Sequence, residues 1–268
     1  IIQHTYGISP EMEDILKILL LAIIQGVTEF LPISSSGHLV IAKYFLNLRE
    51  GGATLEIILH AGTLFSILFF YRNRLIEIIK NLTNKDHEEW SYFRFILIAI
   101  IPIFIIGMLY SKNIELFYND PFFTSCLLIL TGIFLISSNF FKIGILKLSK
   151  TSAFIIGLGQ MLAILPGISR SGMTIGLAKL FGIESKKAAE FSFLIVIPVL
   201  CGVLIRFLIL EETESFYSSD LLLLGFIISA LVGYLALSWL VSILIKGHFW
   251  YFGVYCILLG SICLFILL

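Results

Sequence analysis

Arg170 is a fixed positive charge inside an otherwise apolar run, LPGISRSGMTIG at residues 165–176. A guanidinium group can bind two phosphate oxygens at once. Glycine exposes backbone N–H groups, and the N-terminus of a helix favours an anion. SRSG and a similar element, SSSGH at residues 34–38, are each expected to open a short helix. We therefore predict a phosphate site that combines Ser34, Ser36, Gly37, Ser169, Arg170, Ser171, Gly172 and Thr174.

The residues around SSSGH could perform a reaction on that phosphate. Glu29 can ligate a hard divalent cation or move a proton. His38 titrates near neutral pH and can act as an acid or a base. Ser35, three residues before His38, could act as a nucleophile. These residue types predict hydrolysis of a phosphoester or phosphoanhydride, with Glu29, Ser35, His38 and Arg170 as catalytic residues. The spacing leaves open whether Ser35 or a water molecule attacks.

Structural interpretations of the same residues remain open. Serine and glycine in membrane helices are more often packing residues than ligands. Arg170 could cap helix carbonyls, or Glu29 could pair with it for purely structural reasons. The combination with His38 favours the functional interpretation over either residue taken alone.

A second group of polar residues is ambiguous. Glu56 and His60 lie four residues apart on one predicted helix, so they share a face and could form either a metal pair or a satisfied buried pair. Glu190 and Arg206 allow the same two interpretations. We assign supporting roles to Thr28, Glu56, His60 and Glu190.

The composition places these polar residues in a membrane protein. The chain of 268 residues is 59% hydrophobic and 13% charged, and its mean hydropathy is +1.02, far more apolar than soluble domains. The 18 basic and 18 acidic residues balance, so we expect no nucleic-acid partner. We expect packing roles for the four cysteines and no cleavable targeting segment at the N-terminus.

The elements that must position the site are apolar helices. A spanning helix needs about 20 mostly apolar residues. Two apolar regions, 12–48 and 151–183, are each broken in the middle, by FLPISSSGHL and LPGISRSGMT. They predict re-entrant helical hairpins, because irregular backbone at membrane depth must be enclosed by protein or water. Six stretches are predicted to span the membrane: 54–71, 93–110, 121–140, 189–210, 221–245 and 249–268.

The chain aligns with itself when it is shifted by about half its length. This pattern predicts an all-α polytopic membrane protein, one membrane domain of residues 1–268, with repeat halves 11–140 and 150–268. Each half is one hairpin plus three spans. Because three spans are an odd number, the halves are expected to have inverted topology. A shift of 135 pairs Gln25 with Gln160, Ser34 with Ser169, Ser36 with Ser171 and Gly37 with Gly172, and a shift of 134 pairs Glu56 with Glu190 and Arg72 with Arg206.

Lysine and arginine predict the orientation. The loops on one side carry most of them, whereas the other side carries few, together with the acidic loop EETESFYSSD at residues 211–220. The positive-inside rule then places the basic side in the cytoplasm and both termini outside, with the first hairpin entering from the outer face. The sparse side has Lys17, Lys43, Arg49, Lys112 and Arg206, and the rich side includes Arg72, Arg74, Lys80, Lys85, Arg94, Lys142, Lys147 and Lys150.

QGVTEFLPISSSGHL at residues 25–39 and LPGISRSGMTIG at residues 165–176 resemble the two signature regions of the undecaprenyl-diphosphatase family, also called bacitracin-resistance proteins. The resemblance covers essentially the whole chain, including AAEFSFLIVIP at residues 188–198. It implies removal of the terminal phosphate from undecaprenyl diphosphate in the plasma (inner) membrane, at a site open to the outer face. It also implies a divalent cation, Mg or Ca, held by Glu29 and Gln25; since many members have Glu where Gln25 stands, the two-carboxylate form of that site is absent here.

Other classes can be weighed against this resemblance. A secondary transporter or flippase could use the same inverted repeat and the same arginine to carry a lipid phosphate without cleaving it. Phosphatidic-acid-phosphatase-like enzymes also use a PSGH element, but they need an Arg-Pro element that this chain lacks. The expected partners are a polyprenyl diphosphate, membrane lipids and, as an open alternative to a monomer, a second copy in a homodimer.

Overall fold

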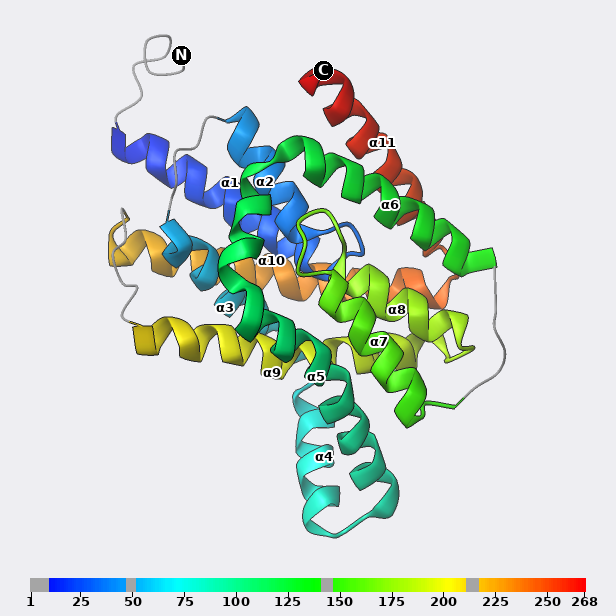
Figure 1. The fold of residues 1–268 in the computed structure, drawn as a ribbon. Coiled ribbons are helices and arrows are strands. Elements are labelled where there is room, and N and C mark those ends of the chain that lie inside the picture. Colours follow the sequence, from blue (N-terminus) through cyan, green and yellow to red (C-terminus); the bar gives the residue numbers. More distant parts are fainter. Residues whose placement is uncertain (1–9, 47–51, 141–146, 211–216) are drawn as a thin grey trace.

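A computed structural model describes residues 10–46, 52–140, 147–210 and 217–268. The regular elements in these ranges are all helices (Figure 1). In chain order they are α1 (Pro10–Phe30), α2 (Ser35–Phe45), α3 (Gly52–Phe70), α4 (Arg72–Thr83), α5 (His87–Glu115), η2 (Leu116–Asn119), α6 (Pro121–Phe140), α7 (Lys150–Leu162), α8 (Arg170–Leu180), α9 (Ser185–Leu210), α10 (Ser219–Ile245) and α11 (Trp250–Leu267).

The predicted spans correspond to long helices. Five described helices are long and apolar enough to cross a membrane: α5, α6, α9, α10 and α11. The sixth predicted span is α3, which meets this test only together with α4, at a bend of 67°. The molecule is therefore an all-helical, multi-pass membrane protein, as the sequence predicted.

The helix α4 was not foreseen. Together with the start of α5 it forms a helical hairpin that projects from the bundle at the bottom of Figure 1. Arg74 holds it in place: its guanidinium binds both carboxylate oxygens of Glu89 on α5, at 3.1 and 2.8 Å, and its Nε lies 2.9 Å from Glu190 on α9. Burial lowers the pKa of Arg74, but these hydrogen bonds and charges outweigh it and the net pKa is raised. Three helices are joined by this one side chain.

Close helix pairs build the bundle. α1 and α3 both pack on α10, α5 packs on α7, and α6 packs on α11. A Cβ atom added at Gly132 of α6 would lie 2.5 Å from the carbonyl oxygen of Gly253 of α11, and one added at Gly253 would lie 2.7 Å from that of Gly132. The two backbones can approach this closely only because both residues lack side chains, which is how membrane helices commonly associate.

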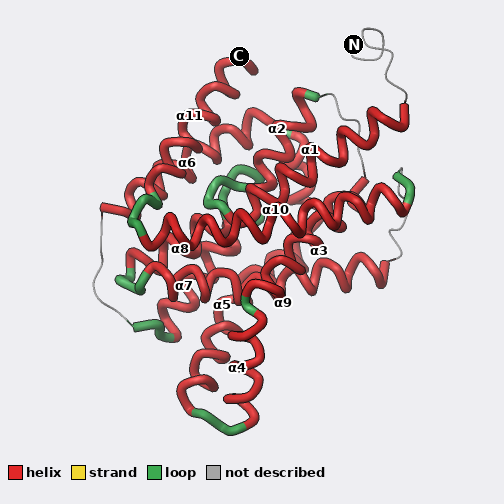
Figure 2. Tube along the Cα trace, turned by 180° about the vertical axis from the view of Figure 1, so that it is seen from behind, coloured by secondary structure: helices red, strands yellow, loops and turns green. Residues whose placement is uncertain are grey.

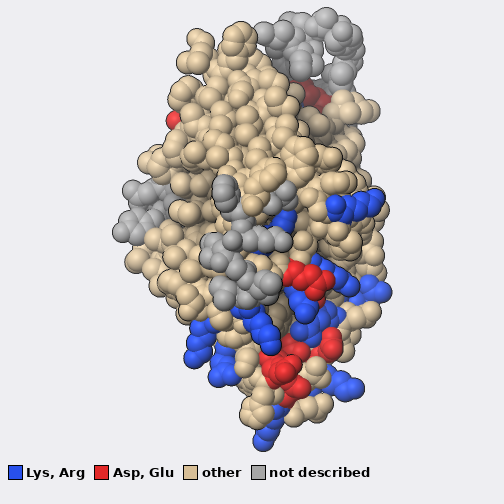
Figure 3. Space-filling model, turned by 90° about the vertical axis from the view of Figure 1, so that its right-hand side faces the viewer, with Lys and Arg blue, Asp and Glu red and all other residues tan. Residues whose placement is uncertain are grey.

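The four cysteines are free thiols, and Cys256 and Cys263 are buried, in agreement with their expected packing role. On the face shown in Figure 3, basic and acidic side chains gather on the lower part of the molecule, toward α4, while the upper part is almost uncharged. Arg49, Lys142 and residues 211–216, which entered the orientation argument, lie outside the described residues, and so does the side chain of Lys112.

The helix pairs α1–α2 and α7–α8 are the two predicted hairpins, and each is broken where the sequence indicated. Their connecting loops lie beside each other in the middle of the molecule, as the loops of Figures 1 and 2 show from opposite sides. The fold therefore brings together two segments about 135 residues apart in the sequence.

Candidate active site

The first hairpin breaks at residues 31–34, where Pro32 interrupts the helical pattern. Ser34 has a φ of 69°, an uncommon value for a residue other than glycine. Its hydroxyl accepts a hydrogen bond from the Gly37 N–H at 3.2 Å and so caps α2. The cap fixes the direction in which the first turn of α2, with Ser35 and His38, leaves the loop.

The second hairpin repeats this construction. Ser169 caps α8 by accepting from the Gly172 N–H at 3.1 Å. Gly167 has a φ of 99°, and a Cβ atom there would lie 2.4 Å from the carbonyl oxygen of Thr124 on α6. Only glycine fits that loop without a shift of backbone. Thr131 of α6 secures it further, because its hydroxyl donates to the Gly167 carbonyl at 2.8 Å.

Two hydrogen bonds join the hairpins directly. The Gly167 N–H donates to the Ser34 hydroxyl at 3.1 Å, and the Ser171 hydroxyl donates to the Leu31 carbonyl at 3.1 Å. Each loop thus supplies a polar group that satisfies a buried backbone group of the other. Mutual dependence of this kind fixes the distance between the starts of α2 and α8.

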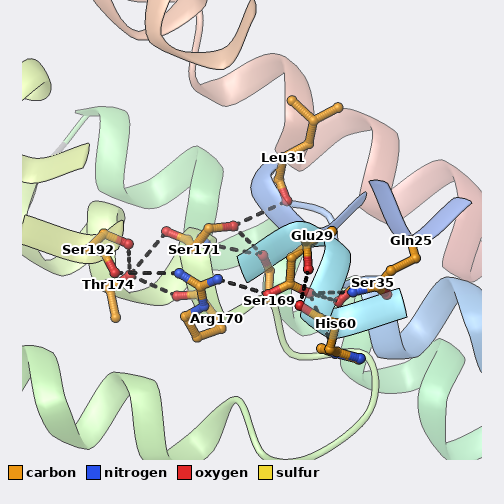
Figure 4. A network of polar contacts seen from close by, with 12 residues as sticks. Gln25, Glu29, Leu31, Ser35, His60, Ser169, Arg170, Ser171, Thr174 and Ser192 are labelled. Atoms are coloured by element: carbon orange, nitrogen blue, oxygen red, sulfur yellow. Dashed lines mark hydrogen bonds and ion pairs between the residues drawn. The ribbon is translucent and has the colours of Figure 1, made fainter. Parts of the chain in front are cut away.

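The carboxylate of Glu29 is the centre of the site (Figure 4). Its Oε1 lies 2.9 Å from Arg170 Nη2, so an anion of the first hairpin pairs with the cation of the second. Its Oε2 accepts hydrogen bonds from the Ser35 hydroxyl at 2.7 Å and from Gln25 Nε2 at 3.1 Å. Glu29 is only 8% exposed. A buried carboxylate of this kind is tolerated because charge and hydrogen bonds surround it.

Helix α9 supports Arg170 from the other side. Arg170 Nη1 donates to the Ser192 carbonyl at 3.4 Å, and its guanidinium carbon lies 5.7 Å from the centre of the Phe193 ring. The hydroxyls of Thr174 and Ser192 are also hydrogen-bonded to each other. Ser192 and Phe193 were not among the predicted site residues. The stretch AAEFSFLIVIP had been noted only for its resemblance, and a serine in an apolar span was the available signal.

His60, and not His38, lies beside the Glu29 carboxylate. His38 lies outside the network around Glu29: its ring nitrogens contact the Ser34 carbonyl and the hydroxyl of Tyr255 on α11. His60 of α3 instead places its Nε2 3.8 Å from Glu29 Oε2. Spacing alone favoured His38 because it is near Ser35 in the sequence, whereas His60 arrives through the packing of α3.

The remaining supporting residues have other partners. The carboxylate of Glu56 pairs with Lys43, so it does not form the metal pair considered with His60. The hydroxyl of Thr28 donates to the Ile24 carbonyl of its own helix at 2.7 Å. Glu190 binds Arg74 at the α4 hairpin. Ser36, predicted as a phosphate ligand, has its hydroxyl oxygen 3.4 Å from that of Ser34. None of these contacts involves the Glu29 carboxylate.

The side chains at the site offer few ligand atoms for a metal ion. Among the described residues, no group of three or more His, Cys, Asp or Glu side chains is placed to hold a metal ion. Gln25 is fully buried, and its Oε1 has no hydrogen-bond partner in the described structure. This orphaned amide oxygen and the Glu29 carboxylate, which Nε2 of the same side chain contacts, are oxygen ligands of the type that a hard divalent cation takes, and phosphate and water would supply its other ligands.

The fold and site define a multi-pass helical membrane protein with a buried charge pair where two broken helices meet. Sequence comparison adds the family. Residues 18–262 match the sequence profile of the family described as bacitracin resistance protein BacA. The chain belongs to that family.

Named relatives extend the similarity over nearly the whole chain. The chain is 38% identical to undecaprenyl-diphosphatase 1 of Bacillus licheniformis, over 92% of its own length and 96% of the relative's. It is also 38% identical to the undecaprenyl-diphosphatase of Christiangramia forsetii, with the same coverage. Identity to undecaprenyl-diphosphatase 2 of Bacillus thuringiensis is 36%, over 94% and 98% of the two chains.

Proposed function

We propose that this protein hydrolyses undecaprenyl diphosphate to undecaprenyl phosphate and inorganic phosphate. This reaction would return the lipid carrier for cell-wall polymer synthesis. The names of the relatives support the substrate, and one observation of the structure carries the chemistry. The Glu29 carboxylate contacts both Ser35 of the first hairpin and Arg170 of the second.

Arg170 and the helix N-termini are the groups proposed to bind the diphosphate. A guanidinium has five N–H donors, and those of Arg170 that do not bind Glu29 or Ser192 remain for phosphate oxygens. The first N–H groups of a helix have no partner within it. Since α2 and α8 begin beside each other, their N–H groups and dipoles both favour an anion there.

Ser35 is the proposed nucleophile, because it is the hydroxyl that the buried carboxylate holds. Glu29 would take the proton from Ser35 Oγ as that oxygen bonds to the terminal phosphorus. The bond from phosphorus to the bridging oxygen then breaks, and undecaprenyl phosphate leaves. Water hydrolyses the phosphoserine in a second step. In this mechanism Glu29 acts as a general base.

The alternative is direct attack by water, and Ser35→Ala separates the two. A lost nucleophile should lower phosphate release by at least about 10³-fold, whereas a lost hydrogen bond to Glu29 should lower it only about 10-fold. Acid-quenched wild-type protein should also carry a phosphate on the peptide that contains Ser35. A variant that keeps a tenth of the activity, with no phosphopeptide in the wild type, would establish water as the nucleophile.

A divalent cation, Mg or Ca, belongs to the proposal. The Glu29 carboxylate and the orphaned Gln25 Oε1 are the oxygen ligands that this chain offers. When bound, such a cation would neutralise charge on the transferring phosphoryl group. EDTA should therefore abolish phosphate release, and added Mg or Ca should restore it.

The predicted orientation and repeat are also proposals. We infer that both termini and the open side of the site face outward, with the α4 hairpin in the cytoplasm. The packing supports an inverted repeat, since α1 packs on α10 and its counterpart α7 packs on α5. In a cysteine-free background, an impermeant maleimide should label Ser218→Cys in intact cells but Lys85→Cys only after lysis. The reverse labelling pattern would show that the orientation is opposite to the one inferred.

That the protein forms a homodimer stays a prediction.

The experiment that tests the function measures phosphate release by purified protein in detergent. Wild type, Glu29→Ala and Arg170→Ala are compared, each with and without EDTA. Cation-dependent release that both substitutions abolish would support the hydrolase. Folded wild-type protein that binds the lipid but releases no phosphate with the cation restored would contradict the hydrolase. That result would favour the transporter, although the names of the relatives do not support a transport function.

A further inference from the structure

The imidazole of His38 is held by two hydrogen bonds. Its Nδ1 lies 2.7 Å from the Ser34 carbonyl oxygen, and its Nε2 lies 2.8 Å from the hydroxyl oxygen of Tyr255. The two rings are parallel within 4°, with centroids 5.6 Å apart. Tyr255 lies 217 residues further along the chain, on α11. The last helix therefore completes the surroundings of a residue in the first hairpin.

These contacts fix the tautomer of the ring. A carbonyl oxygen can only accept, so the proton of neutral His38 must be on Nδ1, pointing at Ser34. Nε2 then carries the lone pair and accepts from the Tyr255 hydroxyl. Of the two ring nitrogens, Nε2 is the one that can exchange a proton with a substrate, because its partner is a side-chain hydroxyl that can move aside, whereas a backbone carbonyl occupies Nδ1.

The position of the pair differs from that of the charged centre. Tyr255 is 43% exposed, whereas Glu29 is 8% exposed. His38 itself is half-buried and contacts the exposed Tyr255 of α11, so the pair is less enclosed than the Glu29 carboxylate.

We propose that Tyr255 is a positioning residue for His38. Its hydroxyl donates to Nε2 and so holds the imidazole as the Nδ1-protonated tautomer, with Nε2 kept free of a proton, and its ring restricts rotation of the imidazole. The proposal rests on the hydrolysis proposed above, and it adds to the general base Glu29 a second proton carrier, His38, for which the residue types predict an acid or base role. It assigns to α11 a part in the reaction that no sequence motif indicates.

Steady-state kinetics of Tyr255→Phe test this role. The substitution keeps the stacked ring and removes only the hydroxyl. One hydrogen bond of this kind corresponds to a change of about 3- to 10-fold in rate, so kcat should fall by that factor while KM stays within about 2-fold. Tyr251→Phe, on the same helix but stacked on His248, is the matched control and should leave both constants unchanged.

NMR of protein labelled with ¹⁵N-histidine provides a readout that a merely structural role would not change. His38→Ala assigns the His38 signals. Wild type should show neutral His38 protonated on Nδ1, and Tyr255→Phe should shift only the His38 Nε2 signal. An Nε2-protonated wild type would overturn the proposal, even if Tyr255→Phe did not fold.

The remaining outcomes are equally decisive. A Tyr255→Phe protein with wild-type kcat, or with unchanged His38 signals, overturns the proposal while leaving the hydrolase intact. Absence of phosphate release in wild type would instead contradict the proposed function itself, so the two failures can be distinguished.

Discussion

In both hairpins a serine stands directly before the second helix and caps it through the N–H of a glycine three residues on. Ser34 does this at 3.2 Å and Ser169 at 3.1 Å. The next residue in each case, Ser35 or Arg170, contacts the same carboxylate from opposite sides. Two similarly built loops therefore supply two different groups to one centre.

The difference between the hairpins lies in a few side chains. The position 135 residues after Glu29 holds Ile164, and the one after His38 holds Met173. Gln25 binds Glu29, whereas its counterpart Gln160 has no partner for either amide atom among the described residues. The first hairpin thus carries the groups proposed to move protons, and the second carries the cationic side chain of Arg170. Separation of opposite charges onto two loops means that neither hairpin forms the site alone.

Removal of the cation should have the largest effect. Arg170→Ala leaves Glu29 buried without its ion-pair partner and removes the proposed phosphate ligand. We expect phosphate release to fall by about 10²- to 10³-fold, together with a loss of stability of about 3 kcal/mol or more. Release and thermal unfolding in detergent measure the two effects separately.

Arg206→Ala is the matched control for that change. Arg206 is exposed on α9 and has no part in the Glu29 network, so its loss should leave release within about 2-fold of wild type, as for other surface substitutions. Equal losses of phosphate release in Arg170→Ala and Arg206→Ala would mean that activity depends on the net charge of the protein and not on the position of Arg170. The contrast between the hairpins would then disappear.

The two glutamines give the sharpest contrast. Gln25→Leu removes a donor to Glu29 and the orphaned oxygen proposed for the cation, so release should fall about 10-fold or more and need more Mg or Ca. Gln160→Leu removes a buried amide without partners and should raise stability by about 1 to 2 kcal/mol with activity retained. Cation titration and thermal unfolding are the measurements. Equal damage from both changes would make the second hairpin a functional copy of the first.

The hydrogen bonds that cross between the loops should have the smallest effect. Ser34→Ala and Ser171→Ala each remove one of them, at a cost of about 1 kcal/mol in the free energy of unfolding and a few-fold in rate. Because Ser34 also caps α2, its substitution should cost more than that of Ser171. Unfolding in detergent measures the order of the two effects. A larger effect from Ser171→Ala would show that the bond from Ser171 to Leu31 outweighs the cap and the crossing bond of Ser34 together.

The long helices and the broken hairpins could be predicted from the sequence because apolar length and Pro, Gly and Ser clusters are local signals. The predicted span 121–140 coincides with α6. The first break, 31–34, falls within the predicted loop FLPISSSGHL, and the second, 163–169, overlaps the predicted loop LPGISRSGMT. Helix α4 was missed, since its 12 residues are amphipathic and follow α3 almost without interruption. Its place depends on Arg74 reaching two other helices, which no local pattern encodes.

The same division holds for the site. The sequence by itself determined the membrane fold, the two loops and the residue types for phosphate chemistry, because each depends on neighbours within a few positions. Only the tertiary structure decided that Ser35 and Arg170 share the Glu29 carboxylate, that His60 lies beside it, and that Tyr255 holds His38. Those contacts join residues on separate helices, and helix packing, which depends on shape over the whole chain, brings them together.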